Sequence, residues 1–247
     1  MGRVFLTILK TIFKFSLVLG VICLICITIF VSSVFKSCCE LMQFTEDFIK
    51  MMETAKKENN DNNLKYVVFN EDKSTILEVP KKLNGDFKIP DGVTTIGDFA
   101  FRDCNITSVT FANSVTGIES WGFAGCKNLT SIDIPDKVTT IGPGAFAGCE
   151  NLTRIDLPDS VEKIGFGAFA NCNSLTDIKI PPKVTVIEWT LFSNCSKLSS
   201  INIPDGVTEI KEQAFIGCNN LKEVSIPKTC SYKENSFPEG CKVTIRD

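Results

Sequence analysis

One pattern of about 23 residues, present in six near-copies, constrains this chain more than any other feature of its sequence. A representative copy runs from Pro135 to Leu157 and reads P-D-K-V-T-T-I-G-P-G-A-F-A-G-C-E-N-L-T-R-I-D-L. The same residue types recur at fixed places: Val at 93, 115, 138, 161, 184 and 207; Phe at 101, 123, 146, 169, 192 and 215; Cys at 104, 126, 149, 172, 195 and 218. The spacing is 22 residues once, from the first copy to the second, and 23 thereafter. A fixed period in this range predicts a solenoid, in which each copy forms one turn.

The residues of one copy predict the path of one turn. L-T-S-I-D-I-P, from Leu129 to Pro135, has the L-x-x-L-x-L spacing of a leucine-rich repeat strand. Proline ends that strand, P-D makes a corner, and V-T-T-I forms a second short strand. Gly142 allows the next bend, and A-F-A-G-C is predicted to form a helical or 3₁₀ turn. The expected fold class is therefore an α/β leucine-rich repeat solenoid, mostly β, with short helical or 3₁₀ turns.

Stacked turns place like residues in columns. Parallel strands lie about 4.8 Å apart, so the repeated Phe, Val and Cys side chains should line the core. A disulfide between neighbouring cysteines of the column is an alternative that the spacing allows, but a repeated inward position is explained by packing of free thiols. A metal site is not expected, because zinc needs ligands that converge tetrahedrally and a column presents collinear sulfurs.

Both ends of the repeat array, residues 90–227, depart from the pattern. Residues 64–89 contain two β-prone segments, 66–69 and 76–79, around N-E-D-K-S-T, which predicts a hairpin that caps the first turn. Residues 228–247 form a degenerate seventh copy, with Cys230 in the Val column, Cys241 in the Cys column and Phe237 one residue early. A Cys230–Cys241 disulfide is the alternative for this C-terminal cap.

The segment from Phe15 to Phe35 has twenty-one residues without a charge, about 30 Å as a helix, which matches a bilayer core. It is predicted to be a single transmembrane helix. A cleaved signal peptide is the alternative, but the apolar run is too long and no A-x-A site follows. Basic residues precede the span, so residues 1–14 are expected to be a short cytoplasmic tail and the repeats extracellular or lumenal. Cys38 and Cys39 directly follow the span, and three interpretations stay open for them. They are palmitoylation sites if they face the cytosol, partners in an intermolecular disulfide if they face the outside, or thiols without a role.

Residues 36–63 are predicted to hold an amphipathic helix and a polar linker. Apolar residues from Leu41 to Ala55 are spaced 3, 4, 3, 4, which is the spacing of a short coiled-coil seam. The polar run K-K-E-N-N-D-N-N, from Lys56 to Asn63, breaks the helix and is predicted to be the linker. Two interpretations stay open. The helix either covers the first turn of the solenoid or supports weak self-association through residues 41–55.

Composition excludes several functions. The chain has 247 residues, no histidine and a net charge of -3 at a pI near 5.3. Without histidine there is no Ser-His or Cys-His pair and no histidine metal site, and without a basic footprint nucleic acid is not an expected partner. No phosphate loop appears, and the repeated aspartates follow prolines at corners. We therefore expect no enzyme activity and no cofactor.

Two sets of residues differ from copy to copy and are the candidate protein-binding sites. The first is a set of large aromatic residues on predicted loops: Phe99, Trp121, Phe166 and Trp189. The second lies on the outward strand face: Arg154, Asp177 and Lys179. Aromatic residues are preferred interface anchors, although they would also serve to cover the edge of the core. Solenoids commonly bind partners on an outward strand face.

Four N-x-S/T sequons are candidate glycosylation sites, at Asn105, Asn128, Asn151 and Asn194. They are expected to recur at one position of the repeat, so the alternative is that the turn itself requires asparagine there.

The pattern P-D-x-V-T-x-I-G-x-x-A-F-x-x-C-x-x-L-T-x-I-x-I closely resembles the BspA-like leucine-rich repeat family. The resemblance covers about Val79 to Pro227, and the hairpin followed by G-D-F-K-I-P resembles the entries to such arrays. Members occur on bacterial surfaces and in microbial eukaryotes such as trichomonads. The resemblance implies a surface protein that binds other proteins or host matrix, and it implies no catalytic residue. The N-terminal membrane segment of this chain departs from the family pattern.

Together these features predict a membrane-anchored leucine-rich repeat protein that serves as a cell-surface protein-binding or adhesion module. The alternative is a structural spacer or scaffold without a dedicated ligand, which would also be compatible with an intracellular location.

Overall fold

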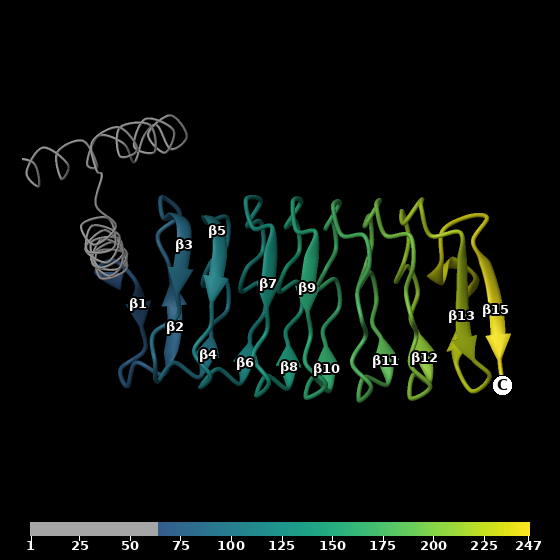
Figure 1. Cartoon of the computed structure of the whole chain (residues 1–247), viewed down its shortest axis with the longest axis horizontal. Helices are drawn as coiled ribbons and strands as arrows, with labels where there is room; N and C mark the ends of the chain where they lie inside the picture. The colour runs from purple at the N-terminus through teal and green to yellow at the C-terminus, as the bar shows by residue number, and fades with distance from the viewer. Residues whose placement is uncertain (1–63) are drawn as a thin grey trace, which may run out of the picture. The chain divides into compact units, whose positions relative to one another are not determined.

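The computed structural model describes residues 64–247, in which successive copies of the repeat form successive turns of a β-solenoid. Figure 1 shows these turns stacked in chain order, from the blue strands near residue 68 to the yellow strand at the C-terminus. Within residues 64–247, no helix has the length and apolar character to span a membrane. The predicted transmembrane helix (15–35) and amphipathic helix (41–55) lie outside the described residues.

One side of every turn, here called the valine face, carries a short strand from the V-x-x-I segment. These strands are β2 (Thr75–Glu78), β4 (Thr95–Ile96), β6 (Gly117–Ile118), β8 (Thr140–Ile141), β10 (Lys163–Ile164), β11 (Val186–Ile187), β12 (Glu209–Ile210) and β14 (Ser231–Tyr232). They pair in parallel and in register from β2 to β10 and again from β11 to β14, with Ile118 opposite Ile141 and Ile141 opposite Ile164. The isoleucines point inward and the residues before them point outward, as period-two alternation requires.

The L-x-x-L-x-L segments form a second side, the leucine face. Its strands are β3 (Asn84–Lys88) paired with β5 (Asn105–Thr110), β7 (Ser131–Asp133) with β9 (Arg154–Asp156), and β13 (Glu223–Pro227) with β15 (Lys242–Arg246), all in parallel. A single bridge joins Lys179 to Asn202. The ladder is interrupted between β5 and β7, where the repeat spacing changes from 22 to 23 residues.

The third side, the turn face, corrects the prediction of helical or 3₁₀ turns at A-F-x-x-C. Two positions per turn have positive φ, as at Phe99 (58°) and Asp103 (59°) in the first copy. These left-handed residues interrupt any run of 3₁₀ hydrogen bonds. The amides of Phe99, Phe101 and Asp103 instead donate to carbonyl groups of the next turn, at 2.7 to 3.0 Å. Amides that bond to the next turn therefore alternate with amides that make single i→i−3 bonds within the segment, and the 3₁₀ helix found in residues 64–247 is η1 (Glu234–Ser236).

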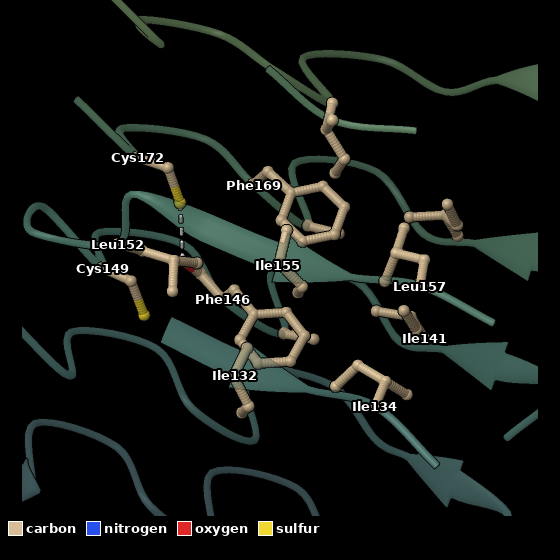
Figure 2. Close-up of a cluster of buried hydrophobic side chains, with 14 of the residues drawn as sticks. Ile132, Ile134, Ile141, Phe146, Cys149, Leu152, Ile155, Leu157, Phe169 and Cys172 are labelled. Carbon is tan, nitrogen blue, oxygen red and sulfur yellow. Dashed lines mark hydrogen bonds between the residues drawn. The ribbon is translucent and has the colours of Figure 1, made fainter. Parts of the chain in front are cut away.

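The core consists of the predicted columns. The six repeat phenylalanines are fully buried and stack with ring centroids 4.7 to 5.7 Å apart. Figure 2 shows Phe146 and Phe169 in this stack, flanked by Ile132, Ile155 and Leu157 from the leucine face. The repeat valines are also buried. The solenoid is thus held by one continuous apolar core, as expected when no single repeat can bury its own apolar side.

The cysteine column has a polar role that packing alone does not explain. Each thiol from Cys126 to Cys218 donates a hydrogen bond to the backbone carbonyl oxygen of the Phe of the preceding copy, at 3.0 to 3.2 Å. All cysteines of residues 64–247 are free thiols, so neither a disulfide in the column nor a Cys230–Cys241 disulfide is present there. Burial raises the pKa of Cys104 to about 11 and that of Cys149 to about 12.

The ends of the array use different devices. At the N-terminal end, β1 (Val68–Phe69) pairs antiparallel with β2 through a turn in which the Asn70 side chain accepts from the amide of Thr75 at 2.9 Å. At the C-terminal end, the amide of Lys233 donates to the buried hydroxyl of Ser236, which donates in turn to the carbonyl oxygen of Ile210. The hydroxyl thus links the backbone of Lys233 to that of the preceding turn, and Phe237 stacks on Phe215 with ring centroids 5.3 Å apart.

Candidate functional site

The candidate aromatic residues lie on one edge of the solenoid, where the valine face meets the turn face. We call the set Phe99, Trp121, Pro143, Phe166 and Trp189 the aromatic stripe, because each of five consecutive turns contributes one member. Backbone hydrogen bonds join the members: the amide of Trp121 donates to the carbonyl oxygen of Pro143, and the amides beside Pro143 and Phe166 donate to the next member along. At about 4.8 Å per turn, the stripe extends for about 20 Å.

Exposure differs along the stripe. Phe99, Phe166 and Trp189 are 46%, 49% and 51% exposed, whereas Trp121 is half-buried. Trp121 lies across the next turn, since a Cβ added at Gly144 would come within 2.6 Å of two ring carbons of the indole. Phe99 and Trp121 occupy a left-handed position (φ 58° for both) that Gly144 and Gly167 occupy in later copies. A bulky residue there costs on the order of 1 kcal/mol, so backbone geometry does not explain the choice of an aromatic side chain.

A shallow groove of about 520 Å³ runs beside the stripe on the valine face. Its floor is Gly142 and Gly165, and the stripe forms one wall through Pro143, Phe166 and Trp189. These glycines do not have positive φ, so the prediction that Gly142 provides conformational freedom is wrong. Close approach requires them instead: a Cβ at Gly165 would lie 2.4 Å from the nitrogen of Pro143. Glycine therefore lets the turns pack closely and leaves the groove open.

We call this groove, lined by Gly142, Gly165, Pro143, Phe166 and Trp189, the aromatic groove. Charged side chains also line it. Besides the stripe and the two glycines, its lining includes Thr140, Glu162, Lys163, Val186 and Glu188. Glu162 is paired with Lys183 at 2.9 Å. Within residues 64–247, Glu188 and Lys163 have no ion-pair partner, which leaves one carboxylate and one ammonium group available to a ligand.

The second candidate set lies on the leucine face and does not form a cationic patch. The side chain of Arg154 pairs with Asp156 on its own strand, and Lys179 pairs with Asp159 at 2.9 Å. Asp177 is exposed between them and has no ion-pair partner in the described part of the chain. The set is thus a row of mostly neutralised, solvent-exposed charges.

A second hollow, of about 710 Å³, lies near the C-terminal end of the same face. Its one cation, Arg246, is already engaged by the carboxylate of Asp205 at 2.8 Å and by the carbonyl oxygens of Ser225 and Ile203. This arrangement fixes β15 to earlier turns and leaves little for a ligand to bind.

The four sequon asparagines are all exposed, but they do not share one position in the repeat. Asn105, Asn128 and Asn151 directly precede the first apolar residue of the L-x-x-L-x-L segment, whereas Asn194 lies one residue before a column cysteine and has positive φ (60°). The expectation of a common position is wrong for Asn194. The side-chain amides of Asn105 and Asn151 donate to carbonyl oxygens of the preceding turn at 3.2 and 2.9 Å, so these two asparagines also support the turn.

The groove-lining role of Gly142, Gly165 and Glu188 was not predicted from the sequence, in which Gly142 was expected only to allow a bend. The signal was present in the repeat alignment. These three residues and Lys211 each follow the isoleucine of the V-x-x-I segment, a position that is glycine in some copies and charged in others. Because this position follows the valine-face strand and belongs to neither strand of the turn, it was interpreted only as a bend.

The arrangement of these side chains is suited to binding a ligand. The groove has apolar rings, a close-packed floor and a few charged groups on its rim, which is the usual make-up of a binding surface. Across residues 64–247, no group of three or more acidic or thiol side chains is placed to hold a metal ion.

The comparisons with known proteins agree with this architecture. The model of the BspA-type leucine-rich repeat region, which contains six copies, matches residues 80–195 and 139–245. The solved structure of the leucine-rich repeat protein of T. pallidum is 30% identical with a TM-score of 0.58, covering 72% of this chain and 81% of that one. No curated protein matches the sequence significantly.

Two further solved structures are similar. A leucine-rich cell surface protein of Faecalibacterium prausnitzii is 33% identical with a TM-score of 0.62, and the match covers 72% of this chain and 52% of that one. A leucine-rich repeat protein of Eubacterium ventriosum is 28% identical with a TM-score of 0.64, covering 74% and 49%. This chain therefore spans only about half the length of these two proteins. From the matched repeats and the shared solenoid, the chain belongs to the BspA-type leucine-rich repeat family.

Proposed function

We propose that this protein is a membrane-anchored recognition protein that uses its repeats to bind a protein or host-matrix ligand outside the cell. The ligand contacts the aromatic stripe. The observation that carries the proposal is that five consecutive turns place an aromatic residue or proline on one edge and that three of these side chains, Phe99, Phe166 and Trp189, are exposed, although the core columns already account for the stability of those turns.

Two physical arguments support the stripe as the contact surface. Large aromatic side chains lose little conformational entropy on binding and bury a large area, so they dominate many interfaces. In addition, the side chains of Phe99, Phe166 and Trp189 are each about half exposed. Large apolar side chains that line up on one surface are typical of an interaction site.

The location rests on separate support. The uncharged segment from Phe15 to Phe35 has the length of a membrane helix, and the basic residues before it favour a cytoplasmic N-terminus. The similar protein of Faecalibacterium prausnitzii is described as a cell surface protein. Weak self-association through residues 41–55 would add avidity to a weak single contact.

Topology is tested with an epitope tag placed after Asp247 in the full chain expressed in cells. Antibody labelling of intact cells is the expected result. Labelling only after permeabilisation would contradict surface display, and protease protection of isolated membranes would then separate a lumenal domain from a cytosolic scaffold.

Recognition is tested on the same cells with the double variant Phe166→Ala, Trp189→Ala. We expect attachment to matrix-coated surfaces to fall at least fivefold while surface labelling is unchanged. The matched control is Ile216→Ala with Ile245→Ala, which removes exposed apolar side chains outside the stripe. Equal attachment by both variants would favour the alternative function, a spacer that holds a neighbouring protein at a fixed distance from the membrane.

A further inference from the structure

The aromatic stripe carries two sets of three side chains in which a cation lies over an exposed ring and also contacts a carboxylate. In the first set, Lys211 Nζ lies 5.2 Å from the ring centroid of Trp189 and 2.7 Å from a carboxylate oxygen of Glu209. In the second, Arg102 lies 5.3 Å from the ring centroid of Phe99, and its Nε lies 3.7 Å from Asp103. Such a cation is attracted by the negative face of the ring and by the carboxylate together.

Phe166 differs from these two rings, because no cation of residues 64–247 lies over it. The strand register explains the difference. Val186 and Ile187 pair with Glu209 and Ile210, so the next residue, Glu188, occupies in its turn the position that Lys211 occupies one turn later. The turn after Trp189 therefore carries a lysine, Lys211, at this position, whereas the turn after Phe166 carries a glutamate, Glu188.

The aromatic groove thus contains an exposed ring, Phe166, and a half-buried carboxylate, Glu188, without a cation of the kind that accompanies Phe99 and Trp189. Both the ring face and the carboxylate are electronegative, and a cation between them would be favourable. Lys163 does not supply it, since its exposed side chain makes no cation–π contact or ion pair in the described part of the chain.

We infer that Phe166 and Glu188 form a receptor site for a basic side chain, arginine or lysine, presented by an extended segment of a partner protein. The segment lies in the aromatic groove along the solenoid axis. Its guanidinium or ammonium group stacks on Phe166 and pairs with Glu188, so the ligand completes a ring–cation–carboxylate contact of the kind that Trp189, Lys211 and Glu209 make within the chain. The inference rests on the proposed function and specifies the chemistry of the ligand.

The experiment uses the full chain in detergent micelles, labelled with 5-fluorotryptophan. The chain has two tryptophans, so the ¹⁹F spectrum should contain two tryptophan signals, which the Trp121→Phe variant assigns. Trp189 lines the groove and Trp121 does not, so the second signal is an internal reference. The probe is the peptide acetyl-Gly-Arg-Gly-Arg-Gly-amide, and its counterpart with citrulline for arginine keeps the shape but removes the charge.

We expect the arginine peptide to shift the Trp189 signal saturably and to leave the Trp121 signal in place, with a smaller or no response to the citrulline peptide. Glu188→Gln and Phe166→Leu should each weaken binding about threefold to tenfold, because each removes one half of the contact while keeping its volume. Lys163→Gln should leave binding unchanged or tighten it. Asp177→Asn, on the leucine face, should have no effect.

Several outcomes would overturn the inference. These are the absence of a Trp189 shift, equal shifts with both peptides, unchanged affinity in Glu188→Gln, or weaker binding in Lys163→Gln. The carbohydrate probe cellotriose separates one rival class: a Trp189 shift with this sugar and none with the arginine peptide would make the groove a saccharide site. If cell attachment still depends on Phe166 and Trp189 but the arginine peptide does not bind, the proposed function stands and this inference fails.

Discussion

The thiol of Cys172 lies 3.2 Å from the carbonyl oxygen of Phe146, one turn earlier, and donates a hydrogen bond to it (Figure 2). Four further cysteines make the same contact with the phenylalanine of the copy before them. The two most regular columns of the core are therefore joined to each other, since each cysteine satisfies a buried acceptor of the residue whose ring fills the turn.

Substitution of Cys172 should separate packing from hydrogen bonding. Cys172→Ser and Cys172→Ala both lose the volume of the sulfur, but only serine keeps a donor for the Phe146 carbonyl oxygen. We expect alanine to be more destabilising than serine by about 1 to 2 kcal/mol, the cost of an unpaired buried acceptor. Chemical denaturation of the two variants measures the difference. A serine variant no more stable than the alanine variant would show that the sulfur acts through packing alone.

The buried thiols also predict a pH dependence. Burial raises the pKa of Cys104 to about 11 and that of Cys149 to about 12, from an ordinary value of 9.0. Below pH 9 the folded and unfolded chains both hold these protons. Above it the unfolded chain loses them first, so the free energy of unfolding falls by up to about 1.4 kcal/mol per thiol and pH unit until the folded pKa is reached.

Melting temperatures measured from pH 7 to pH 10 check this dependence. The midpoint should be constant to about pH 8 and then decline. The double variant Cys104→Ser, Cys149→Ser should show a shallower decline than the parent chain, and equal slopes for the two proteins would count against buried thiols as the cause.

The phenylalanine column and the aromatic stripe offer a matched pair only three residues apart. Phe169 is fully buried and stacks on Phe146 at 5.7 Å with ring planes 3° apart, whereas Phe166 is exposed. We expect Phe169→Ala to cost about 3 to 5 kcal/mol, including the cavity, and Phe166→Ala less than about 0.5 kcal/mol. Urea unfolding measures both. A large cost at Phe166 would mean that the stripe covers the core and is not free for binding.

Two glycines of the valine face test close approach between turns. A Cβ at Gly165 would meet the backbone of Pro143 at 2.4 Å, while a Cβ at Gly117 would meet only a flexible carboxylate oxygen of Glu119 at 3.6 Å. We expect Gly165→Ala to destabilise the fold by about 1 to 3 kcal/mol or more, and Gly117→Ala to be neutral or slightly stabilising. Thermal melts of the pair decide, and similar melting temperatures would contradict the role assigned to Gly165.

Charge reversal on the leucine face tests the second candidate site. Arg154→Glu with Lys179→Glu breaks two exposed ion pairs, each worth at most about 1 kcal/mol, so the fold should be retained. If this face binds an acidic partner, attachment of the variant falls. Unchanged attachment would remove the leucine face from consideration and leave the aromatic stripe as the contact surface.

Much of this architecture could be predicted because the same residue pattern occurs in six copies, so each structural inference is supported six times. The columns of Phe, Val and Cys, the corner at proline and the parallel pairing of the V-x-x-I strands all follow from residues that recur at a constant spacing. An inward position in one copy is inward in every copy, since stacked turns share one register. The family could be inferred from the same residues.

The path of the A-F-x-x-C segment was predicted wrongly for a definite reason. Local propensity at A-F-A-G-C favours a helical turn, but the amides of Phe99, Phe101 and Asp103 find carbonyl partners on the next turn. Whether an amide bonds within its own segment or to a neighbouring turn depends on the distance between turns, which no single segment of sequence specifies.

The sequence by itself determined the repeat, its inward columns and the aromatic residues of the stripe, because each of these depends on residue type and spacing along the chain. Only the tertiary structure decided that Gly142 and Gly165 line a groove beside the stripe and that the Trp121 side chain lies over Gly144 in the next turn. These relationships join atoms of different turns. They depend on the stacking distance and register between turns, and those quantities exist only once the chain has folded.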